Sequence, residues 1–327
     1  MVDARDLKSL GLTAVPVRFR PSAWIRATCF AKVNLFLNIA GKRADGYHDI
    51  QSVFQTIALF DTLEISISDT FRLTVEGSAP GMRPDELREG NILEKIYGFF
   101  RERYDLPGIS VRLVKNIPVG AGLGGGSSDG AGLIASLNRL FSLGLGAEEL
   151  REIGARFGSD VPFFIEGGTA RVGGRGEEVL RMAGLEAAKL FFVLIYPGVS
   201  VSTALAYREC VSFGSGTAFP DFLKLIESAE GSASGEWIRK LSGLTVNGFE
   251  EKVKTRFPEV KAACEALTLH SPFTLLSGSG STVFAVFAKE DEARRAHQAV
   301  LPKFPASYFV GSTDEGIRLE MMEHDKA

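Results

Sequence analysis

The stretch that decides the fold is Pro118-Val119-Gly120-Ala121-Gly122-Leu123-Gly124-Gly125-Gly126-Ser127-Ser128-Asp129-Gly130. A strand-like run, Ile109 to Leu113, precedes it, and apolar residues at helical spacing follow it. Glycines turn without steric penalty and let a ligand approach the backbone. A helix N-terminus adds free N–H groups and the positive end of a dipole. Ser127, Ser128 and Asp129 are favoured N-cap types. The pattern predicts an anion-binding loop that opens a helix.

Two familiar nucleotide motifs are excluded by the residues of this loop. It lacks the Gly-Lys-Ser/Thr end of a Walker A sequence, and its spacing does not fit the dinucleotide fingerprint. A flexible turn with a helix cap is the simpler alternative. However, five glycines and two serines between Gly120 and Ser128 exceed what a turn requires. We therefore interpret the loop as a phosphate-binding loop.

Composition places the chain among soluble globular proteins with room for two domains. It has 327 residues, 45% of them hydrophobic and 24% charged, and a net charge of -3. This charge gives no general attraction to nucleic acid or acidic membranes. Three separated cysteines (Cys29, Cys210 and Cys264) form no metal spacing or disulfide framework. The longest apolar run, Leu190 to Tyr196, is too short to span a bilayer. We expect a cytoplasmic protein, a monomer or weak dimer, without nucleic-acid or membrane partners.

An early strand region carries two polar residues on one side. Ala27 to Ala40 reads as strand, and its alternation puts Lys32 and Asn34 on the same face. On spacing alone, a solvated face explains them. The loop Gly41 to His48 then brings Tyr47 and His48, which could hold something planar or anionic, or belong to a surface loop.

Three later segments also allow a structural and a functional interpretation. Asn91 precedes an amphipathic helix and is either a plain N-cap or a nucleotide contact. Asp160 lies in Gly158 to Phe164, where it caps a short helix or acts as a carboxylate paired with a lysine. Leu275 to Phe284 reads as strand, glycine turn and strand, either a plain hairpin or a second polar loop.

The ordered set of motifs resembles the GHMP kinase superfamily, named after galactokinase, homoserine kinase, mevalonate kinase and phosphomevalonate kinase. The form most similar belongs to its 4-diphosphocytidyl-2-C-methyl-D-erythritol kinases. The resemblance rests on Ala31 to Leu37, Arg43 to His48, the glycine-rich loop, Gly158 to Phe164, Val199 to Ala204 and Leu275 to Phe284. It covers nearly everything from Ala27 to Gly311.

The resemblance implies a two-domain α+β GHMP kinase fold. It joins a ribosomal-S5-like N-terminal domain (residues 23–187, after an extension of 1–22) to a ferredoxin-like C-terminal domain (188–327), with a cleft between them. It implies phosphorylation of the 2-hydroxyl of 4-diphosphocytidyl-2-C-methyl-D-erythritol (CDP-methylerythritol) by ATP with Mg²⁺, a step of the non-mevalonate isoprenoid pathway. No side chain is predicted as a metal ligand.

The resemblance also assigns residues to roles. Lys32 and Asp160 are the expected catalytic residues, with Asp160 accepting the hydroxyl proton. The expected substrate contacts are Asn34, Tyr47, His48, Gly278 and Ser279. The expected ATP and phosphate contacts are Asn91, Pro118, Gly120, Ala121, Gly122, Leu123, Gly124, Gly125, Gly126, Ser127 and Ser128.

Several residues depart from the family pattern. Thr28-Cys29-Phe30 stands where small residues are usual, Gly130 and Gly132 stand where alanines are common, and Gly248 replaces an acidic residue. Two alternatives remain open at this point: another small-molecule kinase of the superfamily, such as one for homoserine or mevalonate, and a non-catalytic nucleotide-binding protein. Tyr47-His48 argues against the first, and the pairing of Lys32 with Asp160 against the second.

Overall fold

The computed structural model describes residues 23–83, 90–183, 185, 188–209, 212–229 and 234–323. The extension predicted for residues 1–22 lies outside the described residues, as does Cys210. Cys29 and Cys264 are free and buried, as expected of small apolar side chains. No helix in the described part of the chain is both long and apolar enough to cross a membrane.

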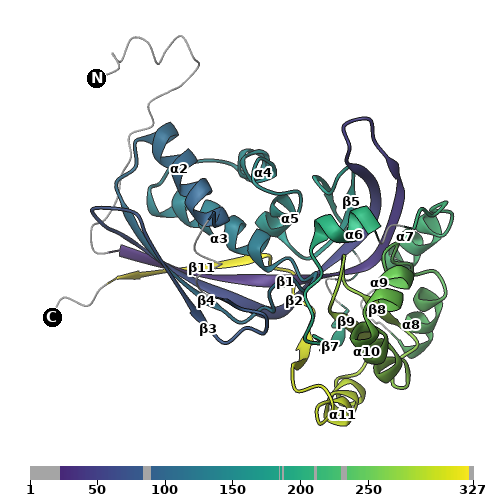
Figure 1. Ribbon diagram of the computed structural model, residues 1–327. Helices are drawn as coiled ribbons and strands as arrows, with labels where there is room; N and C mark the ends of the chain where they lie inside the picture. The colour runs from purple at the N-terminus through teal and green to yellow at the C-terminus, as the bar shows by residue number, and fades with distance from the viewer. Residues whose placement is uncertain are drawn as a thin grey trace.

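A large sheet organises the first half of the chain (Figure 1). Its strand order is β11-β1-β2-β4-β3, and β5 pairs with β2 and with β6. The pairs are antiparallel except β3 with β4. The strands are β1 (Ala23–Lys42), β2 (His48–Ile67), β3 (Arg72–Gly77), β4 (Ile109–Lys115), β5 (Thr169–Gly173), β6 (Glu178–Arg181) and β11 (Ile317–Glu323).

The sequence pattern predicts strands at Gln51 to Phe60, at Leu63 to Ile67 and, last in the chain, at Tyr308 to Gly311. Gln51 to Phe60 and Leu63 to Ile67 form one strand, β2, because Asp61 between them is fully buried and stays in register with Cys29. Beyond the predicted last strand, β11 returns to pair with β1. The division of the chain at residue 187 stays a prediction.

Four helices cover one face of this sheet (Figure 1). They are α2 (Ile92–Tyr104), α3 (Gly125–Leu140), α4 (Ala147–Ala155) and α5 (Val161–Glu166). Their apolar sides bury phenylalanine, leucine and isoleucine side chains against the sheet, as the helical spacing of these residues predicts. This packing fixes α3, and with it the glycine-rich loop, over β1.

The second half of the chain builds a smaller antiparallel sheet, order β10-β7-β9-β8. Its strands are β7 (Phe191–Ile195), β8 (Thr274–Leu276), β9 (Val283–Phe287) and β10 (Ser307–Gly311). Its helices are α6 (Thr203–Glu209), α7 (Phe219–Glu227), α8 (Gly235–Ser242), α9 (Glu250–Arg256), α10 (Pro258–Thr268) and α11 (Glu290–Val300). The predicted hairpin between Leu275 and Phe284 is confirmed as β8 and β9.

The second half of the chain meets the large sheet along the second part of β1. Leu37 forms a parallel bridge with Asn247, and Ile39 forms one with Phe213. Ile57 of β2 bridges Ser312, just after β10. These backbone contacts bring the loop between β8 and β9 to the same region as the glycine-rich loop.

Candidate active site

A cavity of about 970 Å³ lies where these segments meet. Every residue predicted to bind substrate, ATP or phosphate, or to act in catalysis, lines it, with the exception of Ser128. Ser128 is fully buried, and its N–H donates to the carbonyl of Gly124. The structure therefore brings the sequence motifs into one cavity but leaves Ser128 beneath its wall.

The glycine-rich loop needs its glycines for backbone conformation. Gly120, Gly122 and Gly124 have φ of 65°, 76° and 73°, a region that favours glycine. Gly122 is also closely approached: a Cβ there would lie 2.0 Å from the carbonyl oxygen of Ser277. The loop is thus held in one shape by its own dihedral angles and by the second glycine loop.

Hydrogen bonds to the loop carbonyls hold it from both sides. Leu123 O accepts from the N–H of Lys32 at 3.0 Å, and Gly122 O accepts from the hydroxyl of Ser277 at 2.9 Å. Since carbonyls are tied to protein donors, the loop and the start of α3 can present N–H groups to the cavity, as an anion requires.

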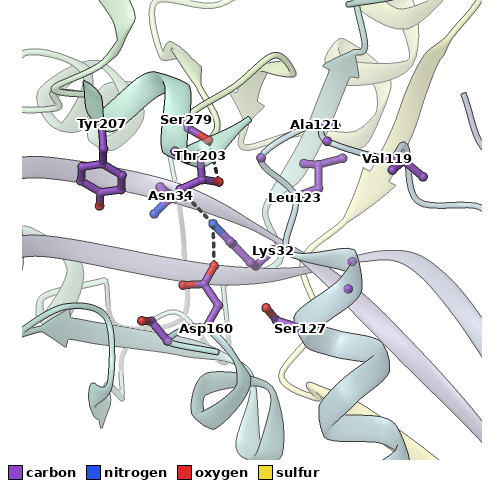
Figure 2. Close-up of a pocket in the computed structure, with 18 of the residues that line it drawn as sticks. Lys32, Asn34, Val119, Ala121, Leu123, Ser127, Asp160, Thr203, Tyr207 and Ser279 are labelled. Atoms are coloured by element: carbon purple, nitrogen blue, oxygen red, sulfur yellow. Dashed lines mark hydrogen bonds and ion pairs between the residues drawn. The ribbon is translucent and has the colours of Figure 1, made fainter. Parts of the chain in front are cut away.

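The helix begins earlier than the N-cap pattern predicts. Its N-cap is Gly124, and no side-chain hydrogen bond caps it. Ser127, Ser128 and Asp129 therefore lie inside the helix, so their prediction as N-caps is wrong. A glycine with positive φ can start the helix directly from the loop, which the preference for Ser and Asp does not capture. Ser127 still faces the cavity (Figure 2).

Lys32 and Asp160 meet at the centre of the site (Figure 2). Lys32 Nζ lies 3.5 Å from Asp160 Oδ2 and donates to Asn34 Oδ1 at 2.7 Å. Lys32 and Asn34 share a face, as predicted, but they are only 3% and 2% exposed, so the solvated-face alternative is wrong. Burial lowers the pKa of Lys32, while the charge of Asp160 opposes that shift.

Asp160 occupies the N-cap position of α5, but its side chain does not cap the helix. Pro162 lies in the first turn, and the Asp160 side chain makes no cap hydrogen bond. The Asp160 side chain is 31% exposed and lines the cavity. The carboxylate is thus left for Lys32 and for whatever occupies the cavity.

The second glycine loop lies close to this pair. A Cβ on Gly278 would be 3.4 Å from Asn34 Oδ1 and 3.5 Å from Lys32 Nζ. The hydroxyl of Ser279 lies 3.3 Å from that of Thr203, at the start of α6 (Figure 2). The hairpin turn therefore forms part of the cavity wall and is not merely a connection.

Aromatic side chains form one end of the cavity. His48 stacks on Tyr207 of α6, with ring centroids 4.9 Å apart, and on Phe213 at 6.0 Å. Burial lowers the pKa of His48, and the charge of Lys42 adds to the effect. A neutral imidazole offers one donor and one acceptor. Tyr47 is 53% exposed, which leaves ring surface for a planar ligand.

Asn91 is the N-cap of α2, which confirms one of the two interpretations of this residue. Its side chain accepts from the N–H of Leu93 at 2.9 Å, at the start of α2. It also lines the cavity. Its contact with a nucleotide stays a prediction.

Two family models match segments of the chain that contribute residues to the cavity. Residues 91–168 match the family described as GHMP kinases N terminal domain, and residues 222–306 match GHMP kinases C terminal. A 4-diphosphocytidyl-2-C-methyl-D-erythritol kinase from Citrifermentans bemidjiense is 38% identical over 81% of this chain and 90% of its own length. One from Listeria monocytogenes is 34% identical over 89% and 97%. This chain belongs to the 4-diphosphocytidyl-2-C-methyl-D-erythritol kinase family.

Solved structures agree with this family and confirm the α+β fold. A crystal structure of 4-(cytidine 5'-diphospho)-2C-methyl-D-erythritol kinase is 28% identical, covers 88% of this chain and 98% of its own, and has a TM-score of 0.69. A homoserine kinase from Cytophaga hutchinsonii has a TM-score of 0.71 at 18% identity, which supports the fold alone. The fold is thus common to the superfamily, while sequence identity separates this kinase family within it.

Three of the departures from the kinase family pattern, Cys29, Gly132 and Gly248, have structural reasons. A Cβ on Gly132 would lie 2.4 Å from Cys29 Sγ, so the thiol occupies the space that an alanine methyl would need. A Cβ on Gly248 would lie 2.7 Å from Ile39 Cγ1 and 3.0 Å from Ser212 O, which leaves no room for an acidic side chain. Cys29 and Gly132 are therefore a matched pair of departures.

A buried ionic cluster beneath the loop was missed by the sequence analysis. Lys115 Nζ contacts Asp61 Oδ2 at 2.5 Å and Asp129 Oδ2 at 2.8 Å. Asp61 also accepts from the N–H groups of Asn116 and Ile117. The other oxygen of Asp129 has no hydrogen-bond partner. Burial raises the pKa of Asp129 to about 7. The sequence signal that could have revealed this cluster is Asp61, a charged residue at a strand position whose side chain faces inward.

Thr203, Tyr207 and Arg175 also line the cavity and were not predicted. Thr203 and Tyr207 lie in a segment that the family resemblance covers but that spacing alone does not mark. Burial raises the pKa of Tyr207 to about 12, and the charge of Asp160 contributes. Its ring is thus a neutral surface at the aromatic end of the cavity.

Proposed function

We propose that the protein transfers the γ-phosphoryl group of ATP to the 2-hydroxyl of CDP-methylerythritol, giving the 2-phosphate and ADP. The observation that carries this proposal is the meeting of the glycine-rich loop, Lys32 and Asp160 in one cavity. Phosphoryl transfer depends on in-line placement and charge stabilisation rather than on covalent chemistry. Those are the tasks that these three features can perform together.

The phosphates of ATP bind over the loop from Gly120 to Ser127 and the start of α3. N–H groups of the first helical turn and the positive end of the helix dipole favour a polyanion there. Lys32 adds a fixed positive charge, which Asn34 and Asp160 hold in place. Because these donors are oriented before the reaction, they can stabilise the charge of the transferring group without reorganisation.

Asp160 is the proposed general base. Its carboxylate lines the cavity beside Lys32 and is not used as a helix cap. It accepts the proton of the acceptor hydroxyl as the new P–O bond forms, and the bond from the γ-phosphorus to the bridging oxygen of ADP breaks. Lys32, 3.5 Å away, faces the same developing charge.

The cytidine end of the substrate belongs to the aromatic end of the cavity. Tyr47 offers a ring face, and His48 offers a donor and an acceptor to the edge of a base. The stack of His48 on Tyr207 orients the imidazole. Homoserine and mevalonate carry no base, so a kinase for either of them would not need these residues.

Mg²⁺ fits the site as a partner of the ATP phosphates. In the described part of the chain, no three His, Cys, Asp or Glu side chains are grouped to hold a metal ion. Mg²⁺ is commonly bound through substrate phosphates and few protein oxygens. The hydroxyl of Ser127, which faces the cavity, would hold it together with those phosphates. When bound, it neutralises phosphate charge.

We further propose a cytoplasmic monomer or weak dimer that acts on small molecules, without nucleic-acid or membrane partners. The net charge of -3 gives no general attraction to either polyanion. Size-exclusion chromatography with light scattering at several protein concentrations tests the oligomeric state. A stable trimer or larger assembly would contradict it.

A coupled ADP-release assay tests the proposed reaction. Purified protein is offered ATP and Mg²⁺ with CDP-methylerythritol, mevalonate or homoserine. We expect ADP release with CDP-methylerythritol and inhibition by CDP. Turnover of mevalonate or homoserine alone would support another kinase of the superfamily, and no turnover with any alcohol would support a non-catalytic nucleotide-binding protein.

A further inference from the structure

The turn between β5 and β6 touches both ends of the proposed substrate site. The carbonyl of Gly174 accepts from the N–H of Ile50 on β2, three residues after Tyr47. On the other side, a Cβ on Gly176 would lie 3.6 Å from Asp160 Oδ1. Residue 175 therefore lies between the aromatic end of the cavity and the catalytic carboxylate.

Arg175 occupies this position and lines the cavity. Its guanidinium carbon lies 4.8 Å from the centroid of the Tyr47 ring, a cation–π contact. Its Nε donates to Glu177 Oε1 at 3.3 Å. The side chain is 36% exposed, so its charge is partly open to the cavity. A structural role, in which Arg175 only supports Tyr47, is the alternative.

The chemistry of the proposed substrate calls for a cation at this place. A diphosphate joins the cytidine to the methylerythritol, so its two negative phosphates must pass between the base site and the reacting hydroxyl. Lys32 is already held by Asn34 and Asp160. The planar fork of an arginine suits phosphate oxygens, and stacking on a ring uses the face of the guanidinium and leaves N–H groups at its edge.

We propose that Arg175 is a specificity-determining residue that binds the diphosphate of a cytidine diphosphate ester. This assignment rests on the proposed function. Through its stack on Tyr47, the same side chain orders the ring on which the base lies.

A ligand series separates the two roles of Arg175. Cytidine, CMP and CDP are titrated by calorimetry into the full chain, unsubstituted and with Arg175→Gln or Arg175→Lys. With Arg175→Gln we expect CDP affinity to fall by at least about 10-fold, as for loss of a charge-assisted phosphate contact, and cytidine affinity to change by less than about 3-fold. Arg175→Lys should fall between. In the kinase assay, KM for CDP-methylerythritol should rise with KM for ATP unchanged.

Arg171 provides a matched control on β5. Its guanidinium lies over the ring of Phe219, 5.8 Å from the centroid, and it lines a separate small pocket. Arg171→Gln should leave the affinities for all three ligands unchanged. Thermal melts of each variant check that the chain is folded.

Two results would overturn the assignment in distinguishable ways. An equal loss for cytidine, CMP and CDP in Arg175→Gln, or no loss at all, refutes the diphosphate contact while the unsubstituted protein still binds CDP. If the unsubstituted protein binds no cytidine nucleotide, both the proposed function and the diphosphate contact are refuted.

Discussion

Gly126→Ala separates the folding role of the glycine-rich loop from its ligand role. Gly126 is the second residue of α3, and a Cβ built there meets nothing within 4 Å. The folded chain therefore has room for the methyl group. Alanine also has a higher helix propensity than glycine, by up to about 1 kcal/mol. We expect the free energy of unfolding to stay the same or rise.

ATP binding should nevertheless weaken. The methyl group projects into the open space where a phosphate would approach the first N–H groups of α3. Loss of one charge-assisted hydrogen bond costs about 1.5–3 kcal/mol, or about 10- to 150-fold in affinity. The dissociation constant for ATP, measured by calorimetry without the acceptor alcohol, should rise by this factor.

Gly235→Ala is the matched control. Gly235 is the first residue of α8, lies outside the cavity, and likewise has nothing within 4 Å of an added Cβ. It should leave ATP affinity unchanged. If Gly126→Ala bound ATP as tightly as the unsubstituted chain, phosphates would not lie over this part of the helix, and the placement of ATP would be refuted.

Two further predictions concern the support beneath the loop. Gly132→Ala should lower the free energy of unfolding by about 1–3 kcal/mol, because the added methyl group overpacks against Cys29. In a Cys29→Ala background this cost should largely disappear. If the effects of the two substitutions on the free energy of unfolding, measured in urea, were additive, Cys29 and Gly132 would not be a matched pair. Because the pKa of Asp129 is raised to about 7, the native chain binds more protons than the unfolded chain between about pH 4 and 7, so stability falls as pH rises through that window. Asp129→Asn should lose this fall, on the order of 2 kcal/mol between pH 5 and 7, and an unchanged pH profile in urea unfolding would argue against it.

Local patterns predicted the pieces of the site well. The density of glycine and serine between Gly120 and Ser127 marks a phosphate loop without long-range information. Strand alternation alone puts Lys32 and Asn34 on one face. The burial of this face depends on the pairing of β1 with β2 and on the loop between β8 and β9. The residues next to Lys32 in the sequence do not contain that information.

The unpredicted features all join distant parts of the chain. Asp61 and Lys115, separated by 54 positions, become partners only when β2 pairs with β4. Arg175 reaches Tyr47 only because β5 pairs with β2. The N-cap position was missed for a local reason: preferences for Ser and Asp give no weight to a glycine such as Gly124, whose positive φ starts α3 early.

The turnover number of Asp160→Asn with ATP and CDP-methylerythritol tests the central claim most directly. The substitution keeps the size of the side chain and removes the proton acceptor beside Lys32. We predict that kcat falls on the order of 10²–10⁴-fold while the dissociation constant for ATP stays close to that of the unsubstituted chain. Full turnover by Asp160→Asn would contradict the assignment of this carboxylate as the base.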